Sequence, residues 1–131
     1  MRWILYVAAA DPTLTGLFLL ASPSLFSQLI LGADASETAL ALGRVGGAAM
    51  FALGLASWPS NATVGPATAA NRALLIFNVL AVPYPSYLGS IANMKGVLLW
   101  PAVAVHAALA VLLALRWLVS TRGNRTDKVA A

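Results

Sequence analysis

Residues 97–118 read VLLWPAVAVHAALAVLLALRWL, and their apolar course is broken mainly by Pro101 and His106. A helix of about 20 apolar residues is long enough to cross the hydrocarbon core of a bilayer. This stretch therefore predicts a transmembrane helix, which we place over residues 97–119.

Three further stretches show the same character and predict the other membrane spans. They cover residues 3–21, 36–57 and 66–90. Ser36 can cap the second of these helices, and Pro66 suits the first position of the third. We therefore predict an all-α integral membrane four-helix bundle over residues 1–120. A basic cytoplasmic tail would follow over 121–131.

The composition of the whole chain excludes an ordinary soluble domain. Hydrophobic residues make up 60% of the chain and charged residues only 9%, whereas soluble domains carry roughly 25% charged residues. A chain this apolar requires lipid or other protein around it. The absence of cysteine also excludes disulfides and thiolate metal sites.

A short amphipathic segment separates the first two predicted spans. Apolar residues at 25, 26, 29 and 30 follow helical spacing, whereas Ser27 and Gln28 are polar. The pattern predicts a short interfacial helix that lies on the membrane surface and ends at Gly32.

The basic residues predict the orientation in the membrane. Arg2, Arg72, Arg116 and the tail fall on one side of the predicted spans, and Lys95 falls on the other. The positive-inside rule then makes both termini cytoplasmic, and we expect a bacterial inner membrane. The residues expected to contact lipid headgroups are Arg72, Arg116, Arg122, Arg125 and Lys128. Three tail cations without interleaved aromatics argue against a nucleic-acid partner.

One strongly polar residue lies near the middle of each predicted span. These residues are Asp11, Arg44, Asn78 and His106. A rise of about 1.5 Å per residue puts all four in one layer about 6 Å thick near the midplane. Because an unpaired charge at that depth costs at least about 2.5 kcal/mol, we expect an Asp11–Arg44 ion pair, with Asn78 and His106 as further hydrogen-bond partners.

Two interpretations of this polar cluster remain open. It can be structural, because interhelical hydrogen bonds hold membrane helices together. It can also be a functional site, either a proton relay or a polar pocket for a quinone-like headgroup or a pigment. A lone His106 is a poor candidate for haem ligation, so no metal site and no catalytic residue is predicted, and the cofactor stays open.

Three glycines predict close helix packing on the second span. Gly43 and Gly47 are four residues apart, and Gly54 follows at heptad spacing. Small residues at such spacing let helix backbones approach closely. The partner helix can belong to this chain or to another subunit.

The sequence resembles small bacterial four-helix membrane proteins of the broadly DoxX-like kind. The resemblance rests on Ala41-Leu42-Gly43-Arg44-Val45-Gly46-Gly47, on the helix containing Asn78, and on Leu99-Trp100-Pro101 followed by His106. It implies a four-helix bundle and no particular activity.

Two functions follow as hypotheses. The first is an accessory or assembly subunit of a larger bioenergetic membrane complex, which packs through small-residue helix faces against membrane lipids and other subunits. The second is a stand-alone carrier or small membrane enzyme that uses the midplane cluster for protons or a lipophilic, quinone-like substrate. The short loops and the lack of a catalytic motif favour the first.

Overall fold

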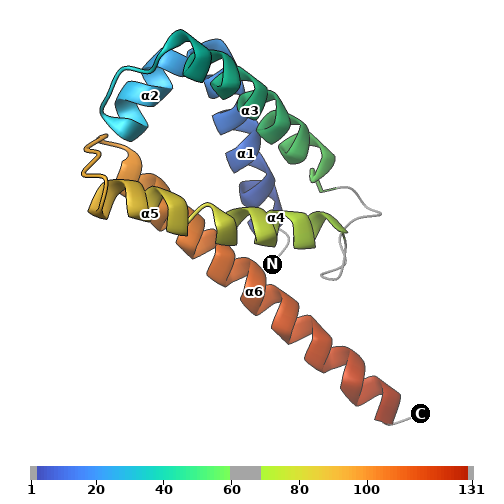
Figure 1. Cartoon of the computed structure of the whole chain (residues 1–131). Helices are drawn as coiled ribbons and strands as arrows, with labels where there is room; N and C mark the ends of the chain where they lie inside the picture. Colours follow the sequence, from blue (N-terminus) through green and yellow to red (C-terminus); the bar gives the residue numbers. More distant parts are fainter. Residues whose placement is uncertain (1–2, 60–68, 130–131) are drawn as a thin grey trace.

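The computed structural model describes residues 3–59 and 69–129, with side chains described as far as Val119. Throughout these residues the regular structure is helical (Figure 1), which confirms the predicted all-α fold class. The helices are α1 (Trp3–Ala21), α2 (Pro23–Leu31), α3 (Glu37–Ala56), α4 (Ala69–Leu80), α5 (Pro83–Ser90) and α6 (Leu99–Val129).

Four helical segments are long and apolar enough to cross a membrane. They are Trp3–Ala21, Glu37–Ala56, Ala69–Ser90 and Leu99–Val119, and they agree closely with the predicted spans. The chain is therefore a multi-pass membrane protein. The predicted start of the third span at Pro66 lies outside the described residues.

Helices α1 and α3 form a closely packed pair. A Cβ atom on Gly47 would lie 2.8 Å from the carbonyl oxygen of Gly16, and one on Gly54 would overlap Thr13. These contacts show that α1 and α3 run antiparallel and that their backbones nearly touch. In lipid, such close packing substitutes for the hydrophobic effect, which does not drive membrane helices together. Gly16, whose role the sequence analysis missed, is the α1 half of this contact.

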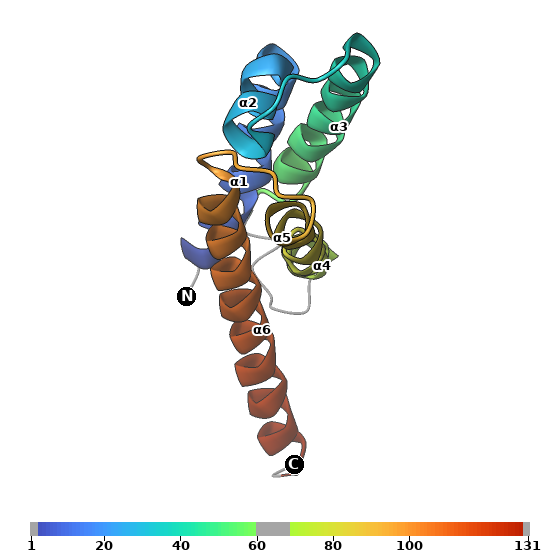
Figure 2. The ribbon, with the colours of Figure 1, turned by 60° about the vertical axis from the view of Figure 1, so that its left-hand side comes forward.

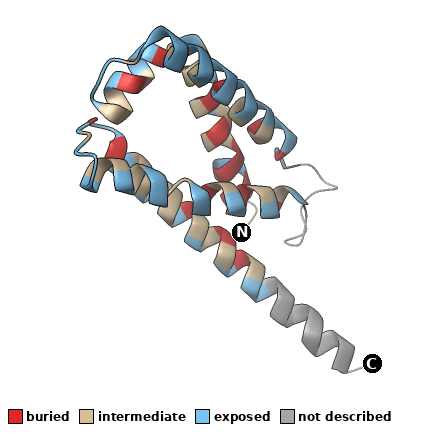
Figure 3. Cartoon of the chain, in the orientation of Figure 1, coloured by how far each residue is buried: buried red, intermediate tan, exposed pale blue. Residues whose placement is uncertain are grey.

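The second group of helices consists of α4, α5 and α6. Pro83 and Pro85 lack the N–H groups that would continue the helical ladder, and the helix of the third span is interrupted between α4 and α5. Both pieces pack against α6. The N-terminal half of α1 joins the two groups, and its buried residues are visible in Figure 3. The core at this junction contains Ile4, Leu5, Ala8, Ala9, Leu74, Leu109 and Leu113.

Helix α2 folds back from the end of α1 and contacts the segment that leads into α6. Gly32, in the left-handed conformation with φ of 71°, ends α2. The Leu98 N–H donates to the Leu29 carbonyl at 2.8 Å, and Gly96 packs against the Ile30 carbonyl so closely that a side chain would not fit. The predicted short helix is therefore present, whereas its location on the membrane surface stays a prediction.

Helix α6 extends beyond the predicted end of the fourth span. It continues to Val129 (Figure 2), so residues 121–129 prolong the helix, and the cytoplasmic location of this basic segment stays a prediction. The segment after Val119 contains no proline, and nothing in its sequence forces the helical backbone to end.

The α1–α3 contact yields a prediction about two neighbouring glycines. Gly47→Ala should destabilise the protein by about 1–3 kcal/mol, because the added methyl group meets rigid backbone atoms of α1. Gly46→Ala is the matched control, since a Cβ at Gly46 has nothing within 4 Å. Unfolding of the purified protein in mixed micelles measures both. Equal stability of the two variants would contradict the observed packing.

Candidate functional site

His106 and Asn78 form a partly buried hydrogen bond between α6 and α4. The Asn78 side-chain amide donates through Nδ2 to the Leu74 carbonyl at 2.8 Å, so its Oδ1 is left as an acceptor. This oxygen lies 3.0 Å from His106 Nδ1. Nδ1 must therefore carry the hydrogen, and in a neutral imidazole Nε2 is then the acceptor. Asn78 thus fixes both the orientation and the tautomer of His106.

Asp11 approaches the same imidazole from α1. Its Oδ2 lies 3.5 Å from His106 Nδ1, which is longer than the 2.7–2.9 Å typical of a charge-assisted hydrogen bond. This oxygen is buried and has no hydrogen-bond partner within the described part of the chain. Asp11 therefore retains the capacity to accept a hydrogen bond. Because a buried polar atom without a partner costs free energy, a hydrogen-bond donor at this position would be stabilising.

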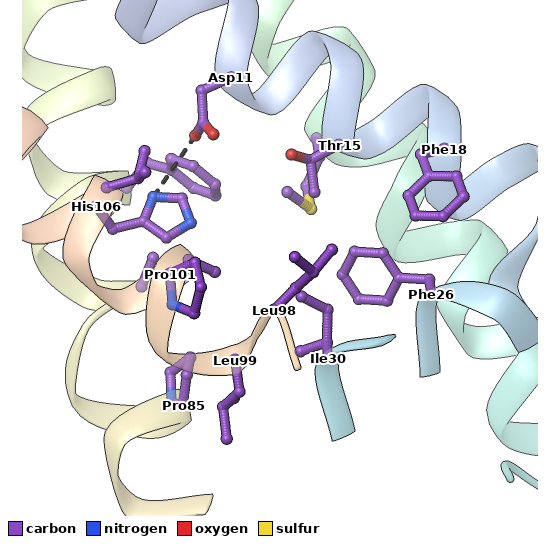
Figure 4. A pocket seen from close by; sticks show the side chains of 15 residues that line it. Asp11, Thr15, Phe18, Phe26, Ile30, Pro85, Leu98, Leu99, Pro101 and His106 are labelled. Atoms are coloured by element: carbon purple, nitrogen blue, oxygen red, sulfur yellow. Dashed lines mark ion pairs between the residues drawn. The ribbon is translucent and has the colours of Figure 1, made fainter. Parts of the chain in front are cut away.

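Asp11 and His106 lie at the edge of a cavity of about 440 Å³ between the two groups of helices. Figure 4 shows the imidazole facing this cavity, with Nε2 on the cavity side. Apart from this pair and Thr15, the lining is apolar. It consists of Phe18, Phe26, Ile30, Met50, Phe77, Ala81, Pro85, Leu98, Leu99, Pro101, Ala102 and Val105.

All six helices or their connections contribute to the cavity wall. Phe26 and Ile30 come from α2, and Leu98 comes from the segment that is hydrogen-bonded to α2. The edge of the Phe77 ring packs against the His106 imidazole, with ring centroids 5.6 Å apart. The cavity thus combines one polar end with aromatic and aliphatic walls.

Arg44 does not join this cluster, and the predicted Asp11–Arg44 ion pair is wrong. Gly43, the neighbour of Arg44, packs against Leu19 near the C-terminal end of α1 and against Pro23 at the start of α2. Leu19 lies about 12 Å along the helix from Asp11. The Arg44 side chain is exposed, and Asp11 pairs with His106 instead. The depth estimate failed because it assumed that α1 and α3 begin and end at the same levels.

The remaining predicted residues fall into three groups. Gly47 and Gly54 lie against α1, whereas Gly43 makes an ordinary contact there. Arg72 is exposed, whereas Arg116 is only 8% exposed, and the headgroup contacts of both residues stay predictions. The side chains of Arg122, Arg125 and Lys128 lie outside the described part of the structure.

Sequence reasoning missed most of the cavity wall. Thr15 follows Asp11 by one helical turn and could have been found from that spacing. Phe18, Phe26 and Phe77 look like ordinary membrane-span residues, because only the tertiary arrangement brings them together. Within the described residues, no group of three or more His, Cys, Asp or Glu side chains could hold a metal ion.

No protein-family model, curated protein or solved structure matches this chain.

The corrected pairing can be tested by double-mutant cycles. Asp11→Ala and His106→Ala should show a coupling energy of about 0.6–2 kcal/mol, because the two side chains are in contact. The matched cycle of Asp11→Ala with Arg44→Ala should be additive within about 0.5 kcal/mol. Unfolding in mixed micelles measures both cycles. A larger coupling of Asp11 to Arg44 than to His106 would refute the pairing.

Proposed function

We propose that this protein binds a lipophilic ring compound with an oxygen substituent, of the quinone or quinol type, in the cavity at Asp11 and His106. The observation that carries the proposal is the polar pair at one end of an otherwise apolar cavity of about 440 Å³. Small-molecule sites are typically clefts of about 300–1,000 Å³ with apolar walls and few polar groups.

The chemistry of the polar end favours a hydroxyl-bearing head. Asp11 Oδ2 is an acceptor without a hydrogen-bond partner in the described chain, and His106 Nε2 is a second acceptor whenever the imidazole is neutral. A phenolic or quinol hydroxyl can donate to either of them. The ring would lie among Phe18, Phe26 and Phe77, where aromatic contacts favour flat molecules.

The role that we assign is binding or carriage of this compound. Asn78 holds His106 in place, and Asp11 and His106 contact the ligand. The pair can also pass a proton to or from a bound hydroxyl, because an imidazole and a carboxyl group both exchange protons readily.

The DoxX-like relationship, the bacterial inner membrane and the cytoplasmic termini belong to the same proposal.

A second candidate function is that of an accessory subunit in a larger membrane complex. The observation that favours it is the outer surface of α3, which packs on α1 and α2 through one side only. The opposite side exposes Leu42 and Val45, at 67% and 68%. Such a surface can be covered by lipid or by a neighbouring subunit.

Ligand binding can be tested by replacing each of two alanines on α6 with phenylalanine. Ala102→Phe should abolish binding of a decyl-substituted benzoquinol, because Ala102 lines the cavity and the added ring would fill part of it. Ala104→Phe is the matched control, since Ala104 is exposed and does not line the cavity. Quenching of tryptophan fluorescence on titration measures the affinity. Equal binding by the two variants would exclude the cavity as the site.

The role of the polar pair needs a separate comparison. Asp11→Ala should weaken benzoquinol binding about 10- to 100-fold, which corresponds to the loss of a hydrogen bond to a charged group. The dimethyl ether of the same quinol should bind the native protein about as weakly, because it cannot donate. If the ether binds as well as the quinol, the polar end does not recognise the hydroxyl.

The subunit hypothesis predicts a complex that survives mild extraction. Val45→Trp should disrupt such a complex by adding bulk to the exposed side of α3, whereas Val111→Trp on the exposed surface of α6 is the control. Native electrophoresis of membrane extracts measures the size of the assembly. Migration of the native protein as a small species without a partner would contradict this hypothesis.

A further inference from the structure

A groove lies between α4 and α6, away from the cavity at Asp11 and His106. Its volume is about 330 Å³, and Arg72, Leu75, Ile76, Ala114, Trp117 and Leu118 line it. The residues from each helix follow spacings of three and four, so each helix contributes a single stripe. The two stripes face each other across a groove.

The polarity of this groove changes along its length. Leu75 and Ala114 lie about one helical turn deeper than Arg72 and Leu118, because α4 and α6 run antiparallel. The Arg72 guanidinium therefore lies at one end of the groove, and the apolar side chains extend from it toward the middle of the span. Trp117 lies at the same end as Arg72, and tryptophan is enriched at the membrane–water interface.

The charge of Arg72 has no counterion among the acidic side chains that the structure describes. Asp11 pairs with His106, and Asp34 accepts a hydrogen bond from Gln28. Glu37 begins α3 and makes no ion pair in the described structure. Arg72 is exposed, so its guanidinium can bind an anion from outside the chain.

We infer that this groove is a binding site for one anionic phospholipid. The guanidinium of Arg72 binds the phosphate group, and part of one acyl chain lies along Leu75, Ile76 and Ala114. Basic pockets between membrane helices recognise anionic headgroups in this way. The apolar part of the groove favours a lipid over a free phosphate ion, because only the lipid has an acyl chain that can contact these side chains.

The test uses native mass spectrometry of the full-length protein in a neutral detergent. The probe is an equimolar mixture of phosphatidylglycerol and phosphatidylcholine with identical acyl chains. The native protein should retain one phosphatidylglycerol about fivefold more often than phosphatidylcholine, since one basic side chain contributes about 1 kcal/mol. Arg72→Ala should bring this ratio close to one.

Two controls separate the groove from general surface charge. Arg44→Ala removes another exposed arginine that does not line the groove, and it should leave the ratio unchanged. Ala114→Trp should lower the retention of both lipids by filling the groove, whereas Ala108→Trp, at an exposed position outside it, should not. Circular dichroism confirms that each variant is folded.

Three outcomes would overturn the inference. The first is the absence of a lipid preference in the native protein. The second is an equal effect of Arg72→Ala and Arg44→Ala. The third is displacement of phosphatidylglycerol by millimolar inorganic phosphate, which would show that the site recognises only the anion.

Discussion

The need to pair polar groups inside an apolar bundle constrains this structure more than any other single factor. The hydrogen bond between His106 and Asn78 satisfies that need for α4 and α6, and it also sets the direction in which the imidazole points. Asp11 brings α1 to the same place. Because lipid offers no alternative hydrogen-bond partners, these side chains fix where three helices meet.

Close backbone contact complements this polar junction on the other side of α1. Gly16, Gly47 and Gly54 let α1 and α3 approach until their backbones nearly touch. The same contact sets the register of the pair, and the register carries Arg44 away from Asp11. A packing constraint between small residues thus decides which charged residues can meet, although none of the glycines touches a charge.

The cavity arises from the way in which the helices are grouped. Helix α1 packs against α3 along one surface. Its N-terminal half also packs against α4 and α6. Its C-terminal half therefore stands apart from α6, and α2 folds back near this space to contact the segment before α6. The polar junction lies at one edge of the resulting space, which is the basis for the proposed ligand site.

The sequence alone determined the membrane class, the four spans, the cap of α3 at Ser36 and the polar candidates, because these depend on local composition and helical spacing. Only the tertiary structure decided that Asp11 meets His106 and not Arg44, and that aromatic residues from three helices share one cavity. Depth along a single helix can be counted from its residues. The relative shift of two helices depends on which side chains let their backbones approach, and that is a property of the packed pair.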